Sequence, residues 1–274
     1  MKRPIGVIDS GVGGLTVAKE IMLLLPEENI IYLGDNARCP YGSRTEQEIV
    51  EFTSEIVNYL LLQNIKALVI ACNTITAYAL QILQKKLSIP VLGVIRPGAR
   101  TAIGETRTKH IGVIGTEATI RSKAYENELL VMDAHVKSTN VACPLFVPLV
   151  ESGYFQEDKV DSIVQSSLQE IRSDKNIDTL ILGCTHFPLL EDSIHRVLGK
   201  SIKLISPSKE TARDLKLVLT ETNLLNDQEK LARYTFITTG GLKNFKFLMD
   251  KILPSPLLEN RQINIEQLSL TNIK

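Results

Sequence analysis

Cys72 and Cys184 occupy similar settings in a chain that contains four cysteines. Each ends a short apolar run, in "LVIACNT" and "LILGCTH", and each precedes polar residues and a helical pattern. Asn73 or Thr74 suits a helix cap in the first setting, and Pro188 suits a first helical turn in the second. Open α/β sheets bind ligands at the carboxyl ends of their strands, where both thiols are expected. Amides at a helix start favour a thiolate or a bound carboxylate.

Two thiols that face one carbon from opposite sides can invert its configuration. One thiolate removes a proton from one face, and the other thiol returns a proton to the opposite face, which is general acid–base chemistry. Two alternatives remain open. Both cysteines can be core residues, since free cysteine is among the most buried residue types, or they can form a redox pair, which requires Cα atoms within about 7 Å. The recurrence of the setting favours proton transfer.

The remaining cysteines, Cys39 and Cys143, lack that setting, and we interpret them as structural or incidental. The sequence has no C-x-x-C pair and no histidine at metal-ligand spacing from a cysteine, so it predicts neither a metal site nor a disulfide framework. Neither cysteine turn contains a lysine for a Schiff base with pyridoxal phosphate. We therefore expect an activity that needs no cofactor.

A glycine-rich turn, "DSGVGG" at residues 9–14, joins an apolar run to a helical pattern. A dinucleotide fingerprint requires a third glycine where this chain has Thr16, and a phosphate loop requires a Gly-Lys pair that the turn lacks. We interpret the glycines as allowing the backbone to approach a small zwitterion, with Asp9 facing its ammonium group or the neighbouring thiol. The alternatives are a simple helix cap at Asp9 and a regulatory module that binds nucleotides or small anions.

Short β-branched runs alternate with helical patterns along the chain, which predicts an α/β fold with mostly parallel sheets. Thr45 and Glu48 have the spacing of a capping box that starts one helix. The expected strands are 5–8, 30–33, 67–71, 91–95, 111–114, 179–182, 202–205 and 234–238. The other expected helices are 75–87, 158–172, 189–198, 210–220 and 244–253.

A weak internal repeat supports two similar halves. The segment "IGVIDSG" at 5–11 has a counterpart in "IGVIGTE" at 111–117, and the distance from Gly6 to Cys72, 66 positions, is close to the 72 positions from Gly112 to Cys184. This pattern favours two lobes that each present one thiol. The proline-containing segments "VIRPGAR" and "ISPSKE", at 94–100 and 205–210, are the expected crossings between the lobes.

The charge balance limits the possible partners. The 274 residues include 31 Lys plus Arg and 31 Asp plus Glu, so the net charge is zero. Binding to nucleic acids or anionic membranes usually requires a basic field. The apolar runs are too short for a membrane span or for the core of a signal peptide. We expect a cytoplasmic protein that binds neither nucleic acid nor membrane.

Six segments together resemble the glutamate racemases of the aspartate/glutamate racemase family. They are "DSGVGGLTV" (9–17), "GDNARCPYG" (34–42), "ACNT" (71–74), "IGVIGTEATIRS" (111–122), "PLVESG" (148–153) and "GCTHFPLL" (183–190). The resemblance implies an enzyme that interconverts L- and D-glutamate for the bacterial cell wall without a cofactor. It also implies two pseudo-symmetric lobes, an active site in the cleft between them and often a homodimer.

Because the family's chain returns to the first lobe at its end, we expect one lobe from 1–97 plus 207–274 and a second from 98–206. The resemblance assigns Asp9 and Cys72 to the first lobe, and Cys184 and His186 to the second. Both cysteines are the expected proton donors and acceptors. Asp9 would assist Cys72, whereas His186 would assist Cys184 with Glu151 nearby.

The same motifs imply a set of substrate contacts, which are Asp9, Ser10, Tyr41, Gly42, Asn73, Thr74, Thr185 and His186. Further candidates for the pocket are Asp35, Thr116 and Thr119. A racemase for aspartate or another amino acid is the alternative within this enzyme class, and the segments "DSGVGG" and "PYG" favour glutamate.

Overall fold

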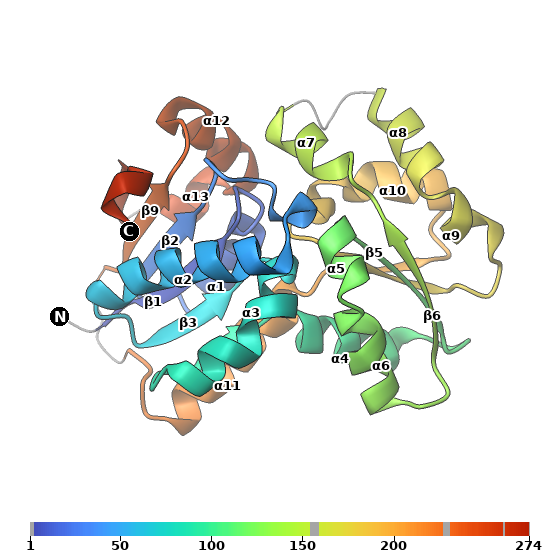
Figure 1. The fold of residues 1–274 in the computed structure, drawn as a ribbon, viewed down its shortest axis with the longest axis horizontal. Helices are drawn as coiled ribbons and strands as arrows, with labels where there is room; N and C mark the ends of the chain where they lie inside the picture. Colours follow the sequence, from blue (N-terminus) through green and yellow to red (C-terminus); the bar gives the residue numbers. More distant parts are fainter. Residues whose placement is uncertain (1–2, 154–158, 227–230, 260, 274) are drawn as a thin grey trace.

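The computed structural model describes residues 3–153, 159–226, 231–259 and 261–273. Two α/β lobes lie side by side, each built on its own sheet, and both ends of the chain belong to the same lobe (Figure 1). Every strand pair in these ranges is parallel, because helical segments connect consecutive strands. The predicted α/β class with parallel sheets is confirmed.

The first lobe contains a six-stranded sheet with the order β10-β9-β2-β1-β3-β4. Its strands are β1 (Ile5–Asp9), β2 (Ile30–Gly34), β3 (Ala67–Ile70), β4 (Val91–Gly93), β9 (Arg233–Thr238) and β10 (Gln262–Gln267). The second lobe contains a four-stranded sheet with the order β6-β5-β7-β8. Its strands are β5 (His110–Gly115), β6 (Lys137–Ala142), β7 (Thr179–Gly183) and β8 (Lys203–Ile205). The order β2-β1-β3-β4 thus recurs as β6-β5-β7-β8, which makes β3 and β7 equivalent strands.

Helices cover both faces of each sheet, since the central strands are buried on both sides. The helices of the first lobe are α1 (Leu15–Leu24), α11 (Ser208–Glu221) and α12 (Leu242–Ile252) on one face, and α2 (Glu46–Leu62) and α3 (Asn73–Lys86) on the other. Those of the second lobe are α4 (Ile95–Glu105) and α6 (Ala124–Met132) on one face, and α7 (Phe146–Glu151), α8 (Lys159–Ser167), α9 (Gln169–Ser173) and α10 (Glu191–Leu198) on the other.

Short helical segments complete the chain: η1 (Tyr41–Ser43), α5 (Glu117–Arg121), η2 (Phe187–Leu190), α13 (Ser255–Leu258) and η3 (Leu270–Asn272). One apolar cluster is continuous between the lobes, because it contains residues of α1 and α11 together with residues of α7, α8 and η2. Within the described ranges, no helix combines the length and apolar character needed to cross a bilayer.

Some predicted elements are wrong in position or type. The segment 94–100 does lie where the chain passes from the first sheet to the second, between β4 and β5, but it forms most of the first half of α4, because Pro97 occupies the first helical turn, where its missing N–H breaks no helical bond. The strand expected at 91–95 therefore ends at Gly93. The helix expected over 158–172 starts at a residue outside the described ranges. Its described part divides at the fully buried Leu168 into α8 and α9.

The sequence analysis missed β6 and β10. Both are edge strands with polar sequences, "KSTNVA" and "QINIEQ", and neither contains a fully buried residue. Edge strands often carry polar residues, so the apolar runs that mark central strands are missing from them. The predicted capping box is confirmed: Thr45 Oγ1 accepts the Glu48 N–H at 3.3 Å, and Glu48 Oε2 accepts the Thr45 N–H at 2.9 Å.

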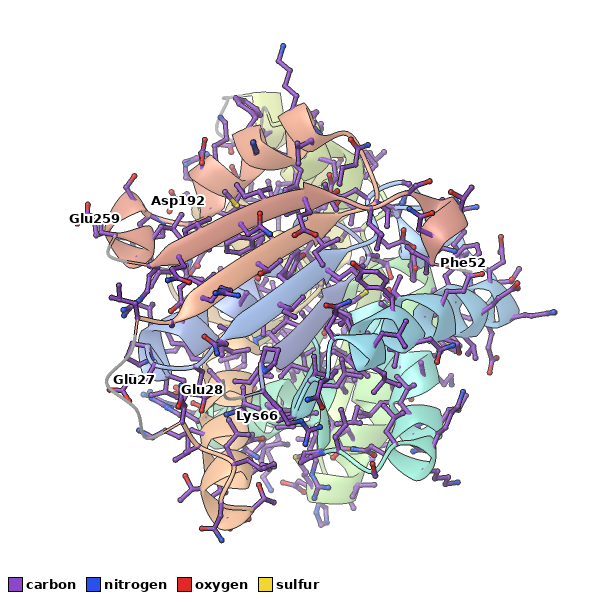
Figure 2. All side chains as sticks on the ribbon, turned by 90° about the vertical axis from the view of Figure 1, so that its left-hand side faces the viewer. Glu27, Glu28, Phe52, Lys66, Asp192 and Glu259 are labelled. Carbon is purple, nitrogen blue, oxygen red and sulfur yellow. The ribbon has the colours of Figure 1, made fainter. Side chains whose placement is uncertain are left out.

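A buried ion pair joins the amino-terminal side of the first sheet to the chain that returns from the second lobe. Lys66 Nζ lies 2.5 Å from Glu28 Oε2, and both side chains are 3% exposed. Figure 2 labels the two residues near one another beside the amino-terminal ends of the strands. Lys66 Nζ also donates to Leu224 O at 2.5 Å, and Glu28 Oε1 accepts the Asn226 N–H at 2.6 Å. The pair therefore anchors the segment after α11 to β3 and to the loop before β2.

We predict that Lys66→Met destabilises the protein by about 3–5 kcal/mol, because it leaves the Glu28 carboxylate buried without its partner. The double variant Lys66→Met/Glu28→Leu should recover most of this loss, since an apolar pair can replace a buried ion pair. Urea unfolding monitored by circular dichroism measures both effects. A Lys66→Met variant as stable as the wild type would contradict this role.

Candidate active site

Residues that follow β1, β3, β5 and β7 line one small cavity between the lobes, with about 250 Å³ of atom-free space. The walls contain both Cys72 and Cys184. The other predicted residues in the walls are Ser10, Tyr41, Gly42, Asn73, Thr74, Thr116, Thr185 and His186. Pro40 and Val147 also line the cavity, although the sequence analysis did not select them. The predicted residues behind the walls are Asp9, Asp35, Thr119 and Glu151.

Cys72 itself occupies the N-cap position of α3, which begins at Asn73. The predicted cap at Asn73 or Thr74 is therefore wrong, because α3 starts directly after the cysteine. The Cys72 sulfur lies 3.7 Å from Ser10 Oγ, so the turn after β1 and the start of α3 meet at this thiol. The amide groups of the first turn of α3 point toward the cavity end of the helix, where they favour negative charge.

Burial raises the pKa of the Cys72 thiol to about 12, and the nearby Asp9 carboxylate raises it as well. The N–H of Ile75, in the first turn of α3, acts in the opposite direction. Cys72 is therefore a protonated thiol at neutral pH, with a proton available for donation.

Cys184 stands at the start of a chain of contacts that leads away from the cavity. Its sulfur lies 3.8 Å from His186 Nδ1, and His186 Nε2 lies 2.8 Å from Glu151 Oε1. Burial lowers the pKa of His186, but hydrogen bonds with Cys184 and Glu151 outweigh burial and hold this pKa well above its usual value. The pKa of Glu151 is lowered despite burial, chiefly by the hydrogen bond from His186. His186 is thus a protonated donor that faces the Cys184 sulfur.

Aromatic packing holds this chain in place. The rings of Phe146 and Phe187 meet edge to face, with centroids 5.0 Å apart and an interplanar angle of 71°. Phe146 begins α7, which ends at Glu151, and Phe187 directly follows His186. This edge-to-face contact, a favourable aromatic geometry, fixes the carboxylate and the imidazole relative to one another.

Asp9 ends β1 and is fully buried behind the cavity. Asp9 Oδ1 accepts the Gly11 N–H at 2.9 Å, and Asp9 Oδ2 accepts the hydroxyl of Thr185, from the other lobe, at 3.0 Å. Burial raises the pKa of Asp9 to about 6, even though His186 and these hydrogen bonds lower it. Asp9 is therefore a carboxylate at pH 7 to 8, on the first-lobe side of the site.

The glycine turn makes room for the second lobe. A Cβ atom at Gly13 would lie 2.5 Å from both His186 Nδ1 and Thr185 Oγ1, so a side chain there would displace the residues after Cys184. A Cβ at Gly14 would lie 2.4 Å from Asp9 Cβ. The sequence analysis interpreted these glycines as allowing a substrate to approach the backbone closely. In the structure, the space beside Gly13 is occupied by residues of the second lobe.

Asp35 does not face the cavity. It is fully buried and accepts hydrogen bonds from the Tyr41 hydroxyl, from Arg38 Nε at 2.6 Å and from Thr239 Oγ1 at 2.6 Å. The Arg38 guanidinium in turn lies 4.2 Å from the ring centroid of Phe52, which Figure 2 labels on α2. Asp35 therefore fixes the loop that carries Tyr41 over the cavity. The prediction that Asp35 itself faces the pocket is wrong, because its side chain positions this loop instead.

Three hydroxyls from both lobes form one hydrogen-bonded group, and two of them, those of Thr74 and Thr116, belong to residues that line the cavity. Thr74 Oγ1 lies 2.9 Å from Thr116 Oγ1 and 3.0 Å from Thr119 Oγ1, and the last two lie 3.0 Å apart. A further buried contact between the lobes was missed from the sequence: the Tyr125 hydroxyl donates to Asn73 Oδ1 at 2.7 Å. This bond leaves the Asn73 amide NH₂ as the group able to donate elsewhere, because its oxygen is engaged.

The other two cysteines have different surroundings. Cys143 is fully buried within the shared apolar cluster, as a structural residue would be. Cys39 is half-buried, and its sulfur lies 3.8 Å from Glu151 Oε1. Residues 39 and 151 are far apart in the sequence, so no spacing pattern indicated this contact.

The geometry of the site also bears on the alternative functions that the sequence left open. The cavity is lined by both cysteines together with hydroxyl, amide and imidazole side chains, a polar lining that suits a small polar molecule. All four cysteines are free thiols, and the two in the cavity walls have opposite partners, a carboxylate near Cys72 and a protonated imidazole near Cys184. This asymmetry suits an acid and a base that act together on one bound molecule.

The fold and the site together define a two-lobed α/β protein with paired thiols, and known proteins share this fold. The Asp/Glu/hydantoin racemase family model matches residues 5–215. The glutamate racemase of Bacillus cereus is 49% identical over 267 residues, which cover 97% of this chain and 99% of that protein. This chain therefore belongs to the Asp/Glu/hydantoin racemase family, and the racemase class implied by the resemblance is confirmed.

Solved structures agree with this assignment. The crystal structure of glutamate racemase isoform RacE1 from Bacillus anthracis has a TM-score of 0.91 and 43% identity, and the match covers 99% of both chains. The glutamate racemase of Francisella tularensis, solved in complex with D-glutamate, has a TM-score of 0.89 and 38% identity, over 98% of both chains. The arrangement of two lobes is thus shared with these enzymes.

We predict that Asp9→Asn stabilises the protein at pH 8 by about 3 kcal/mol, which is the free energy of a pKa rise from 3.8 to about 6. The folded state binds the Asp9 proton more tightly than the unfolded state, so ionisation of Asp9 costs stability as the pH rises through this range. The advantage of the variant should therefore shrink toward pH 4. Urea unfolding at several pH values measures the difference, with the exposed Asp250→Asn as a control. Equal stability of Asp9→Asn and wild type at pH 8 would refute the claim that the buried Asp9 carboxylate destabilises the folded state.

Proposed function

We propose that this protein is a cofactor-independent glutamate racemase that interconverts L- and D-glutamate by a two-thiol mechanism. The observation that carries the proposal is the presence of Cys72 and Cys184, from different lobes, in the walls of one cavity. The relatives named glutamate racemase support glutamate as the substrate. The product D-glutamate would supply bacterial peptidoglycan synthesis in the cytoplasm. A homodimer remains a prediction from the family resemblance.

In the proposed mechanism, the resting enzyme has a base on one side of the substrate and an acid on the other. The protonated His186, held by Glu151, favours negative charge on the Cys184 sulfur. Cys72 keeps its proton, because it is buried near the Asp9 carboxylate. The Cys184 thiolate removes the α-proton from one face of the substrate, and the Cys72 thiol donates its proton to the opposite face. The roles of the two sulfurs reverse for the other enantiomer.

Groups from both lobes bind and orient the substrate in this mechanism. The amide groups at the start of α3 hold one carboxylate, because unpaired N–H groups at a helix start bind anions. The hydroxyls of Thr74, Thr116 and Ser10, together with the Asn73 amide, supply further donors. Asp9 provides negative charge near the substrate ammonium, and Tyr41 with Gly42 covers the cavity.

We predict that Cys72→Ala and Cys184→Ala each abolish racemisation, because each removes one of the two groups that exchange a proton with the α-carbon. Loss of a general acid or base typically costs about 10²–10⁴-fold in rate. A chiral assay of purified protein with L- and D-glutamate, without added cofactor, measures the effect. Cys143→Ala is the matched control, since it removes a buried thiol that does not line the cavity, and it should retain activity.

Normal racemisation by either cavity variant would refute the two-thiol assignment. The same assay over a panel of amino acids tests the substrate separately. Preferential racemisation of aspartate or another amino acid would leave the mechanism intact but replace glutamate as the substrate.

A further inference from the structure

Cys39 is a half-buried thiol that the racemisation mechanism does not use. Its sulfur contacts Glu151 Oε1 at 3.8 Å, and the same carboxylate oxygen contacts His186 Nε2 at 2.8 Å. The three ligand atoms all lie within 4.8 Å of one another. They come from three separate places in the fold: the loop after β2, the end of α7 and the loop after β7. This group of three residues is named the Cys39 cluster below.

We propose that the Cys39 cluster binds a thiophilic divalent cation, with Zn²⁺ as the best match, and that the bound ion inhibits the racemase. The donor set supports this choice. Zn²⁺ binds cysteine sulfur, histidine nitrogen and carboxylate oxygen, and sites with three protein ligands complete a tetrahedron with water. Hard ions such as Mg²⁺ prefer oxygen ligands and would not gain from the thiol.

The distances fit such an ion with a small adjustment. Zn²⁺ lies about 2.3 Å from sulfur and about 2.0–2.2 Å from nitrogen or oxygen, so tetrahedral ligands are separated by about 3.6 Å for S···O and about 3.4 Å for N···O. The Cys39–Glu151 separation of 3.8 Å is already close to the first value. The His186–Glu151 separation of 2.8 Å must open by about 0.6 Å. Rotation of the partly exposed Glu151 side chain can supply this movement.

Charge and access also favour the site. Glu151 Oε1 now accepts hydrogen bonds from the Cys39 thiol and from His186, so two protons occupy the space between the three groups. A divalent ion replaces these two protons, which pass to solvent, and leaves a neutral combination of thiolate, carboxylate and imidazole. The absence of a side chain at Gly11 keeps this space open, because a Cβ there would lie 2.5 Å from Glu151 Oε1 and 3.0 Å from Cys39 Sγ.

The predicted consequence for activity rests on the proposed function. His186 Nδ1 faces the Cys184 sulfur, while its Nε2 belongs to the Cys39 cluster. An ion on Nε2 displaces the Glu151 hydrogen bond and ties the imidazole ring to the metal, so the ring shifts from the position in which Nδ1 lies 3.8 Å from the Cys184 sulfur. Because Cys39 and Glu151 do not line the substrate cavity, the ion lowers kcat more than it raises KM.

Metal binding is tested first, without any measurement of activity. The metal-free full-length protein is titrated with Zn²⁺ by calorimetry and with Co²⁺ by absorption, where a thiolate ligand gives a charge-transfer band. We expect one Zn²⁺ per chain and a thiolate–Co²⁺ band. Cys39→Ser should abolish the band and weaken Zn²⁺ binding by at least about 100-fold, since even outer partners of metal ligands contribute about 10–100-fold. Cys143→Ser is the matched control and should bind as the wild type does.

Cys72→Ser separates this site from a site between the two cavity thiols. It should leave Zn²⁺ binding unchanged, because Cys72 is not part of the Cys39 cluster. Loss of binding in Cys72→Ser with retention in Cys39→Ser would overturn the proposal, and so would equal binding by Cys39→Ser and wild type. Thermal unfolding of each metal-free variant verifies that it is folded.

The racemase assay then tests inhibition. Zn²⁺ should lower the kcat of the wild type and leave Cys39→Ser active, with equal activity of the two proteins in a chelator. Tight binding at the Cys39 cluster without any loss of activity would overturn the inhibitory role. Since binding is measured independently, failure of the metal site and failure of the racemase assignment give different results.

Discussion

The site depends on one geometric constraint: the carboxyl ends of two parallel sheets must stay together across the lobe boundary. Buried hydrogen bonds span this boundary, among them those from Thr185 to Asp9, between Thr74 and Thr116, and from Tyr125 to Asn73. Each would leave a buried polar group unsatisfied if the lobes shifted, at a cost of about 1–3 kcal/mol per group. The apolar cluster that continues from one lobe into the other adds to this restraint. The two thiols thereby share a cavity although they belong to different halves of the repeat.

The two halves that meet at this boundary are chemically unlike. The repeat places a cysteine after β3 and another after β7, but the neighbours differ: a buried carboxylate lies near Cys72, and an imidazole held by Glu151 lies beside Cys184. A symmetric pair would have no preferred proton position, whereas these different neighbours make the two thiols unlike before any substrate binds. The buried charge of Asp9 opposes folding, which is a common compromise at functional sites.

Features encoded by neighbouring residues were predictable from the sequence. The α/β class, the positions of the central strands, the capping box at Thr45 and the place of both cysteines after equivalent strands all follow from local patterns. The polar edge strands β6 and β10 lack such a pattern. The sequence around Pro97 is compatible with both a linker and a first helical turn, so the start of α4 was not predicted. Asp35, Tyr125 and Cys39 make their contacts with segments that are distant in the sequence. No spacing of residues along the chain could therefore predict these contacts.

The central claim is that different groups act on the two faces of the α-carbon, and the isotope at that carbon tests it most directly. L-Glutamate is incubated with the enzyme in heavy water, and both enantiomers are separated and analysed by mass spectrometry at low conversion. The account predicts that the D-glutamate formed carries deuterium at the α-carbon, while the remaining L-glutamate keeps its original hydrogen. D-Glutamate that retains the hydrogen of the substrate would contradict it, because a single base would then have returned the proton it removed.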